Sequence, residues 1–61
     1  MELQEFIKLI RDDKDITIYN LTERRYTESC SRNYINNYMP GLKVLSFDSI
    51  DMDTIIIIVE A

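Results

Sequence analysis

Apolar side chains are densest near the end of the chain, in residues 54–60, which read Thr-Ile-Ile-Ile-Ile-Val-Glu. β-Branched side chains are stiff at χ1 and fit a pleated surface, so this stretch predicts a strand. Apolar and polar residues do not alternate in it, and both faces of the strand therefore carry apolar side chains. Ile56 and Ile58 share one of these faces. We expect them either to lie under a loop, the second helix or a tyrosine, or to contact a second copy or another protein.

A helix is predicted over residues 2–12, where apolar residues recur at the spacing of one helical face. Glutamates lie in its first turn and Lys8 and Arg11 in its last, which is the charge order that the helix dipole favours. The acidic run over residues 12–15 is expected to end the helix in a solvated turn. The apolar stripe consists of Leu3, Phe6, Ile7 and Ile10.

Three more strands and a second helix are predicted from alternation and from turn-forming residues. The turn after the first strand lacks the Asn-Gly or Asp-Gly pair that favours a tight hairpin. The second helix has poor intrinsic propensity; Ser29 or Ser31 caps it, and Pro40 and Gly41 end it. The expected elements are strands over residues 15–20, 24–28 and 42–47 and a helix over residues 29–39.

These elements predict a single domain over residues 1–61. The fold class is α+β in the order α-β-β-α-β-β, with a mostly antiparallel four-stranded sheet and helices packed on one face. A chain of this length buries only about 60% of its unfolded surface, so a stability of a few kcal/mol is expected. Small domains without disulfides are commonly stabilised by self-association, which favours a homodimer.

The composition argues against most catalytic chemistry. The chain has no histidine and one cysteine, which removes intramolecular disulfides, the usual zinc frameworks and every His-based catalytic arrangement. Cys30 has no candidate activating base, and we expect it to be a small buried hydrophobe in the second helix. We therefore expect a non-enzymatic protein without a cofactor or a metal.

Eleven acidic and seven basic residues give the chain a formal charge of −4. Phosphates repel such a chain, so direct nucleic-acid binding is not expected, whereas a basic surface on another protein would attract it. Asp48, Asp51 and Asp53 are either ordinary turn residues or a negative surface that steers a basic partner; they lack the glycine and distal glutamate of a calcium loop. Residues 12–15 would extend this surface if both clusters lay at one end of the sheet.

Arginines and tyrosines gather in the middle of the chain, where Arg24 and Arg25 precede Tyr26 and further tyrosines follow Arg32. This combination is typical of small cores with a wet hydroxyl, of protein-interface hot spots and of single-stranded nucleic-acid platforms. We rank the core interpretation first, a protein interface second and nucleic acid third. In the interface interpretation, Tyr26, Arg24 and Arg25 bind the partner together with the three aspartates of residues 48–53.

No apolar stretch approaches the ~20 residues of a membrane span. The first five residues, Met-Glu-Leu-Gln-Glu, lack the basic region of a signal peptide. We therefore expect a cytoplasmic protein without membrane contact.

Several segments resemble small phage and prophage proteins of Gram-positive bacteria. They are residues 16–21 (ITIYNL), Pro40, residues 44–48 (VLSFD) and residues 53–60 (DTIIIIVE), with the amphipathic segment 3–10 before them. The resemblance covers nearly the whole chain in outline and rests on core and turn residues. Some small acidic phage proteins of this size are anti-CRISPR proteins or other inhibitors of host defence. That class shares no motif, so the resemblance implies no functional residue.

These features predict a phage or mobile-element protein that acts by binding another protein in the cytoplasm of a bacterial host. The most specific form is an anti-CRISPR-type inhibitor that occupies the nucleic-acid-binding surface of a host defence effector such as a CRISPR nuclease. The alternative is a non-catalytic structural or accessory homodimer with no host target, in which Ile56 and Ile58 seal the interface.

Overall fold

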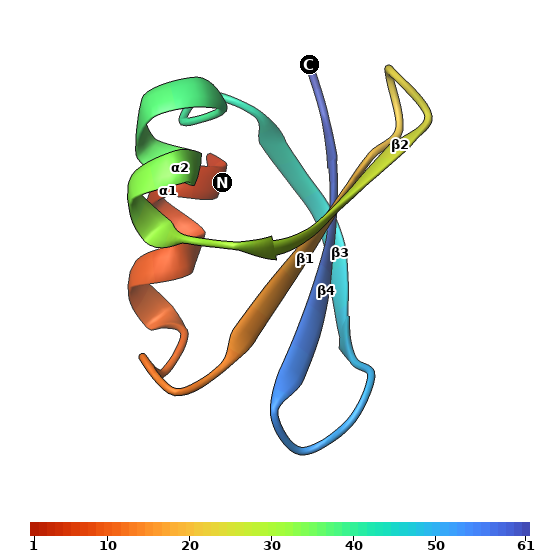
Figure 1. Cartoon of the computed structure of the whole chain (residues 1–61). Coiled ribbons are helices and arrows are strands. Elements are labelled where there is room, and N and C mark those ends of the chain that lie inside the picture. The colour runs from red at the N-terminus through yellow and green to blue at the C-terminus, as the bar shows by residue number, and fades with distance from the viewer.

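The terminal strand β4, Thr54–Glu60, lies inside a four-stranded sheet with the strand order β2-β1-β4-β3 (Figure 1). The structure is a computed structural model that describes all residues from 1 to 61. β4 runs parallel to β1, Asp15–Asn20, and antiparallel to β3, Lys43–Ser49. β2, Arg25–Cys30, is antiparallel to β1 and forms the far edge.

The predicted α+β class with four strands and two helices is confirmed, but the sheet is mixed because its central pair is parallel. β4 enters the sheet as the second strand of the β3–β4 hairpin and is then paired along both of its edges. This position suits a strand that is apolar on both faces. The alternation pattern specifies each hairpin but not the way two hairpins join, so the parallel pairing of β1 with β4 was not predicted.

Both helices lie on one face of the sheet, at the left in Figure 1. The first is shorter than the predicted range 2–12: α1 spans Leu3–Phe6, the 3₁₀ helix η1 spans Ile7–Leu9, and Ile10 is already extended. The element order therefore contains a 3₁₀ helix that was not predicted. The helix ends early because the Arg32 guanidinium occupies carbonyls that would accept hydrogen bonds from a further turn.

The second helix, α2, spans Arg32–Tyr38 and begins at Ser31, whose Oγ accepts a hydrogen bond from the Tyr34 N–H at 3.0 Å. Of the two predicted caps, Ser31 is therefore the one used. Ser29 instead lies in a bulge of β2 with φ of 52°. β2 extends through Cys30, so this cysteine is the last residue of a strand. The prediction that it lies in the second helix is wrong.

The core lies between the helices and one face of the sheet. The odd-numbered residues of β4 face it, with Ile57 and Val59 fully buried. The tyrosines contradict the core interpretation, because Tyr26, Tyr34 and Tyr38 are all exposed. The buried core residues are Leu3, Ile7, Ile16, Ile18, Cys30, Ile35, Ile57 and Val59.

Candidate functional site

The second face of the sheet carries no helix, as the empty space to the right of the strands in Figure 1 shows. Residues that pair directly across neighbouring strands point to the same face. The register therefore assigns two rows of side chains to this uncovered face. One row is Ser46, Ile58, Tyr19 and Tyr26, and the other is Asp48, Ile56 and Thr17.

Ile56 and Ile58 are half-buried on this uncovered face. Ile58 pairs with Tyr19, and the Tyr19 ring packs against the Tyr26 ring with centroids 4.5 Å apart. Tyr19 therefore lies beside Ile58, and both predicted outcomes, cover by neighbouring side chains and contact with a second copy or another protein, stay predictions. The uncovered face remains an apolar strip along β4, with Tyr26 on one side and Asp48 on the other.

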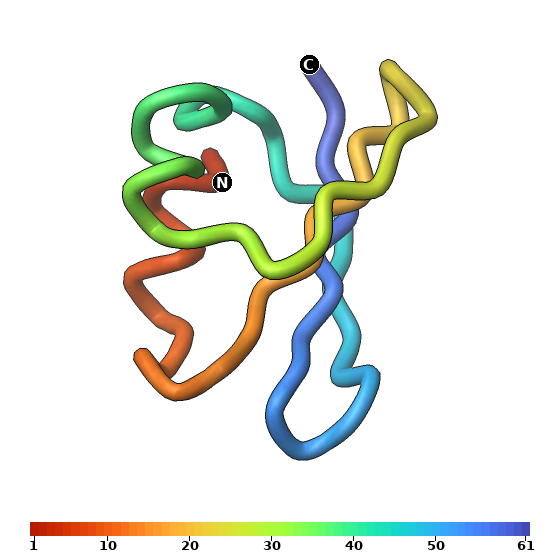
Figure 2. Tube along the Cα trace, in the orientation of Figure 1, coloured from red at the N-terminus to blue at the C-terminus, as the bar shows by residue number.

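The two acidic clusters lie at the same end of the sheet. β1 begins beside the start of β4, where Asp15 pairs with Thr54 and the Asp15 N–H donates to the Asp53 carbonyl at 2.6 Å. The turn before β1 and the turn between β3 and β4 both lie at the bottom of Figure 2. We refer to residues 11–15 and 48–53 together as the acidic end.

The acidic end carries the whole net charge of the chain. It contains six of the eleven acidic residues and two of the seven basic residues, which gives it a formal charge of −4. The five acidic and five basic residues elsewhere cancel one another. The charged residues of the acidic end are Arg11, Asp12, Asp13, Lys14, Asp15, Asp48, Asp51 and Asp53.

The three predicted aspartates are exposed and form local turn contacts. Asp48 accepts a hydrogen bond from the Ser49 N–H, and Asp51 accepts one from the Asp53 N–H, both at 2.8 Å. The Asp53 N–H also lowers the pKa of Asp51, with Thr54 and Lys14 adding smaller effects. No group of three or more acidic or thiol side chains is close enough to hold a metal ion. This end therefore presents exposed carboxylates, two of which, those of Asp48 and Asp51, are oriented by hydrogen bonds within the turn.

The predicted basic anchors lie at the opposite end of β1. Arg24 occupies the turn after β1 with φ of 54°, and Arg25 begins β2. β1 rises by about 3.4 Å per residue, which places this turn about 17 Å from Asp15. The structure therefore does not bring Arg24 and Arg25 together with the aspartates, although Tyr26 does lie on the uncovered face.

Arg32 has a structural role that the sequence did not indicate. Its guanidinium donates to the carbonyls of Ile7 at 2.5 Å, Ile10 at 2.9 Å and Arg11 at 2.8 Å. It also lies 3.3 Å from the Asp12 carboxylate. Arg32 thus joins α2 to the end of the first helix, so it does not belong to a basic aromatic surface. An arginine at the first position of a helix gives no sequence signal for such a contact.

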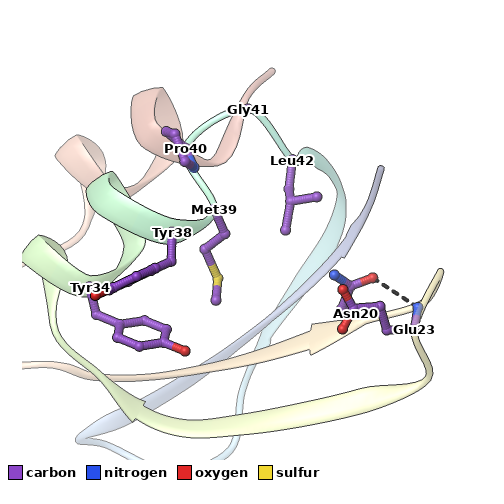
Figure 3. Close-up of a pocket in the computed structure, with 8 residues that line it drawn as sticks. All are labelled: Asn20, Glu23, Tyr34, Tyr38, Met39, Pro40, Gly41 and Leu42. Atoms are coloured by element: carbon purple, nitrogen blue, oxygen red, sulfur yellow. Dashed lines mark hydrogen bonds between the residues drawn. The ribbon is translucent and has the colours of Figure 1, made fainter.

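A groove of about 410 Å³ opens between the β1–β2 turn and the end of α2 (Figure 3). The rings of Tyr34 and Tyr38 pack together with centroids 4.8 Å apart, and Asn20 accepts a hydrogen bond from the Glu23 N–H at 3.2 Å. The groove offers one carboxylate, that of Glu23, and two phenols, those of Tyr34 and Tyr38. The lining residues are Asn20, Glu23, Tyr34, Tyr38, Met39, Pro40, Gly41 and Leu42.

The single thiol is protected. Cys30 is buried, its Sγ donates to the Thr27 carbonyl at 3.4 Å, and burial raises its pKa. A raised pKa leaves less thiolate at neutral pH, which is the reverse of what an activated nucleophile requires.

Comparison of the chain with protein-family models, with curated proteins and with solved structures found no match. None of its helices has the length and apolar character needed to cross a membrane.

Proposed function

We propose that this protein acts by binding another protein, and that the acidic end is the part that meets a basic surface on the partner. One observation carries the proposal: the entire net charge of −4 lies in residues 11–15 and 48–53, and the rest of the chain is neutral. Charge collected at one end attracts a basic surface and orients the encounter, which a uniform distribution of the same charge would not do.

The uncovered face supplies the contact surface that follows this encounter. Asp48 and Ile56 lie side by side in one row of the sheet, so the acidic end is continuous with the apolar strip along β4. Tyr26 is 62% exposed at the far side of the same face. Tyrosines flanked by apolar residues are common anchors of protein interfaces.

The most specific form of this proposal is an anti-CRISPR-type inhibitor encoded by a phage or mobile element. Effectors that hold a guide RNA and its target do so in positively charged channels. A small protein with −4 at one end has the charge to occupy such a channel in place of nucleic acid. The resemblance to small phage proteins supports this form of the proposal.

The test neutralises the three aspartates while keeping the turn. Asparagine retains the side-chain oxygen that accepts the N–H groups of Ser49 and Asp53, so Asp48→Asn, Asp51→Asn and Asp53→Asn together remove charge without removing these contacts. The matched control is Glu5→Gln, Glu23→Gln and Glu28→Gln, which changes the net charge equally but elsewhere.

Both variants are compared with the parent in affinity capture from nuclease-treated bacterial lysate at about 50 mM and about 500 mM salt. Captured effectors are then assayed for guide RNA and target DNA binding. We expect the aspartate variant to lose partner binding at least tenfold, and the control to keep it. Equal binding by all three proteins at low salt would refute the role of the acidic end.

The alternative, an accessory homodimer sealed by Ile56 and Ile58, is favoured by the absence of a helix on their face of the sheet. In this case an Ile58→Lys variant remains folded but loses a dimer that light scattering detects in the parent. A parent protein that is monomeric up to about 1 mM would refute this alternative.

A further inference from the structure

The two edges of the sheet are built differently. The β2 edge carries two charged residues, Arg25 and Glu28, and is interrupted by the bulge at Ser29. β3 is also bulged, between Val44 and Ser46, but this bulge adjoins the part of β3 that the N-terminal segment already pairs. Charges and bulges are the features that keep an edge strand from pairing with another chain. The β2 edge is therefore protected, and the remaining edge is β3.

The first part of the β3 edge is already paired within the chain. The Val44 N–H donates to the Met1 carbonyl at 2.9 Å, and the Leu3 N–H donates to the Leu42 carbonyl at 2.7 Å. Glu2 forms an isolated antiparallel bridge with Lys43. No backbone lies along residues 45–49 on this side.

The backbone groups of this unpaired part point outward. The Ile50 N–H donates to the Thr54 carbonyl inside the β3–β4 hairpin. The direction of the backbone N–H and C=O groups alternates along an antiparallel strand. The backbone groups of Asp48 therefore point towards β4, whereas those of Phe47 and Ser49 point away from the sheet. The Ser49 N–H donates only to the side chain of Asp48, which agrees with this direction.

This edge is also the apolar edge of the molecule. Leu45 is 42% exposed, Phe47 59% and Ile50 58%. A groove of about 350 Å³ runs between the edge and the first helix, and Leu9 at its rim is exposed. Phe47 forms one wall of this groove, where its ring lies 5.0 Å from the Phe6 ring. An added strand would therefore gain backbone hydrogen bonds and cover apolar side chains at the same time.

We propose that the β3 edge pairs with β3 of a second copy of the chain, antiparallel, about a two-fold axis at Phe47. Each Phe47 then exchanges two backbone hydrogen bonds with its counterpart, and the two sheets become one continuous sheet. The two grooves meet at the Phe47 pair, so that each copy covers the apolar groove of the other. The proposal does not depend on the proposed function, because it leaves the uncovered face accessible. It involves part of the acidic end, since Asp48 and Ser49 lie in the paired strand and Arg11 and Lys14 line the groove.

Charge determines both the direction and the register. In an antiparallel pair, the acidic ends of the two copies point in opposite directions. Lys43 of each copy then lies near the acidic β3–β4 turn of the other copy. An axis at Asp48 would set two carboxylates directly opposite each other, which destabilises a strand pair. An axis at Phe47 instead sets Asp48 opposite Ser46. A second copy thus complements this edge in charge as well as in shape.

The contact is small. Five residues of strand and one groove per copy bury less than the roughly 800 Å² per partner of a standard interface. We therefore expect a dissociation constant in the micromolar range or weaker, which sets the concentrations for the test.

Sedimentation equilibrium from about 10 µM to about 1 mM measures the association. We expect the mass to rise from 7.3 kDa towards twice that value. Phe47→Lys and Ser49→Pro should each abolish the rise; Ser49→Pro removes an outward N–H, whose acceptor in the single chain is the Asp48 side chain, and keeps all the apolar side chains of the groove. Ile58→Lys on the uncovered face and Tyr26→Lys on β2 are the matched controls and should keep it.

Cysteine cross-linking in a Cys30→Ser background tests the register. Phe47→Cys should form a disulfide dimer, because a hydrogen-bonded antiparallel pair has Cα atoms about 5.5 Å apart. Asp48→Cys should cross-link much more slowly. A parent that stays monomeric at every concentration overturns the proposal. So does a dimer that Ile58→Lys abolishes and Ser49→Pro retains, or faster cross-linking of Asp48→Cys than of Phe47→Cys.

Discussion

Replacing Arg32 by lysine tests whether one side chain joins the two helices. The guanidinium spans three carbonyl acceptors, those of Ile7, Ile10 and Arg11. Lysine keeps the positive charge but presents a compact ammonium on a flexible stem in place of a planar fork. It can reach one of these carbonyls well, and the others then lose their partner near the end of η1.

The magnitude follows from the number and exposure of these contacts. A hydrogen bond from a charged group contributes about 1.5–3 kcal/mol when shielded from water. The Arg32 side chain is 30% exposed, so its contacts lie at the low end of this range. The ion pair adds little, because the Asp12 side chain is fully exposed. We expect Arg32→Lys to lower the free energy of unfolding by about 1–2 kcal/mol and Arg32→Ala by about 3 kcal/mol.

Thermal unfolding followed by circular dichroism measures this effect. A loss of 1–2 kcal/mol in a domain of this size lowers Tm by about 5–15 °C. Arg25→Lys is the matched control, since Arg25 is exposed and its side chain makes no hydrogen bond or ion pair; its effect should stay within about 0.5 kcal/mol. Asp12→Asn should be equally mild. Similar Tm values for Arg32→Lys and Arg25→Lys would refute the role of Arg32.

Three further predictions concern the backbone, the core and the thiol. Arg24→Gly should raise the free energy of unfolding by about 0.5–1 kcal/mol in urea titrations, because Arg24 has φ of 54° and glycine has no Cβ to strain there; a lower value would show that the turn is unstrained. Ile57→Val should cost about 1 kcal/mol, since Ile57 is fully buried, whereas Ile50→Val at an exposed site should cost less than about 0.5 kcal/mol; equal costs would place Ile57 outside the core. Burial raises the pKa of Cys30, so the native thiol stays protonated where the unfolded thiol ionises. Stability should therefore be complete below the ordinary thiol pKa and fall as pH rises above it. Cys30→Ser should flatten this fall, and an unchanged pH profile in that variant would contradict the assignment.

The elements of this fold could be predicted wherever a pattern repeats within one segment. The alternation of residues 15–20 and the isoleucine run of residues 54–60 gave both strands their observed bounds. The first helix was predicted too long, because its end depends on Arg32, which lies more than twenty residues away along the chain. The parallel pairing of β1 with β4 is likewise a contact between distant segments. Neither leaves a periodic signal in the sequence.

The candidate site could be predicted only in part, because its residues come from segments that are distant in the sequence. The acidic clusters could be recognised from composition, but only the β1–β4 register shows that they lie at one end. Arg24 and Arg25 were grouped with the aspartates because all five residues are charged. Their positions in the sequence do not show that the β1–β2 turn and the β3–β4 turn lie at opposite ends of the sheet. The groove beside Tyr34 and the β3 edge were missed, since each is formed by segments that meet only after folding.

The demands of folding explain some of these surfaces and leave others unexplained. A chain of 61 residues has enough material to cover one face of a four-stranded sheet, so an uncovered face at Ile56 and Ile58 is an expected consequence of size. Size does not require a charge of −4 to collect in two turns, because serine, asparagine or lysine would serve those exposed positions equally well. Like charges placed together also repel, which lowers the stability of a small domain. The acidic end is therefore a feature that the fold tolerates and does not need, and for that reason it is the feature on which the proposed protein-binding function rests.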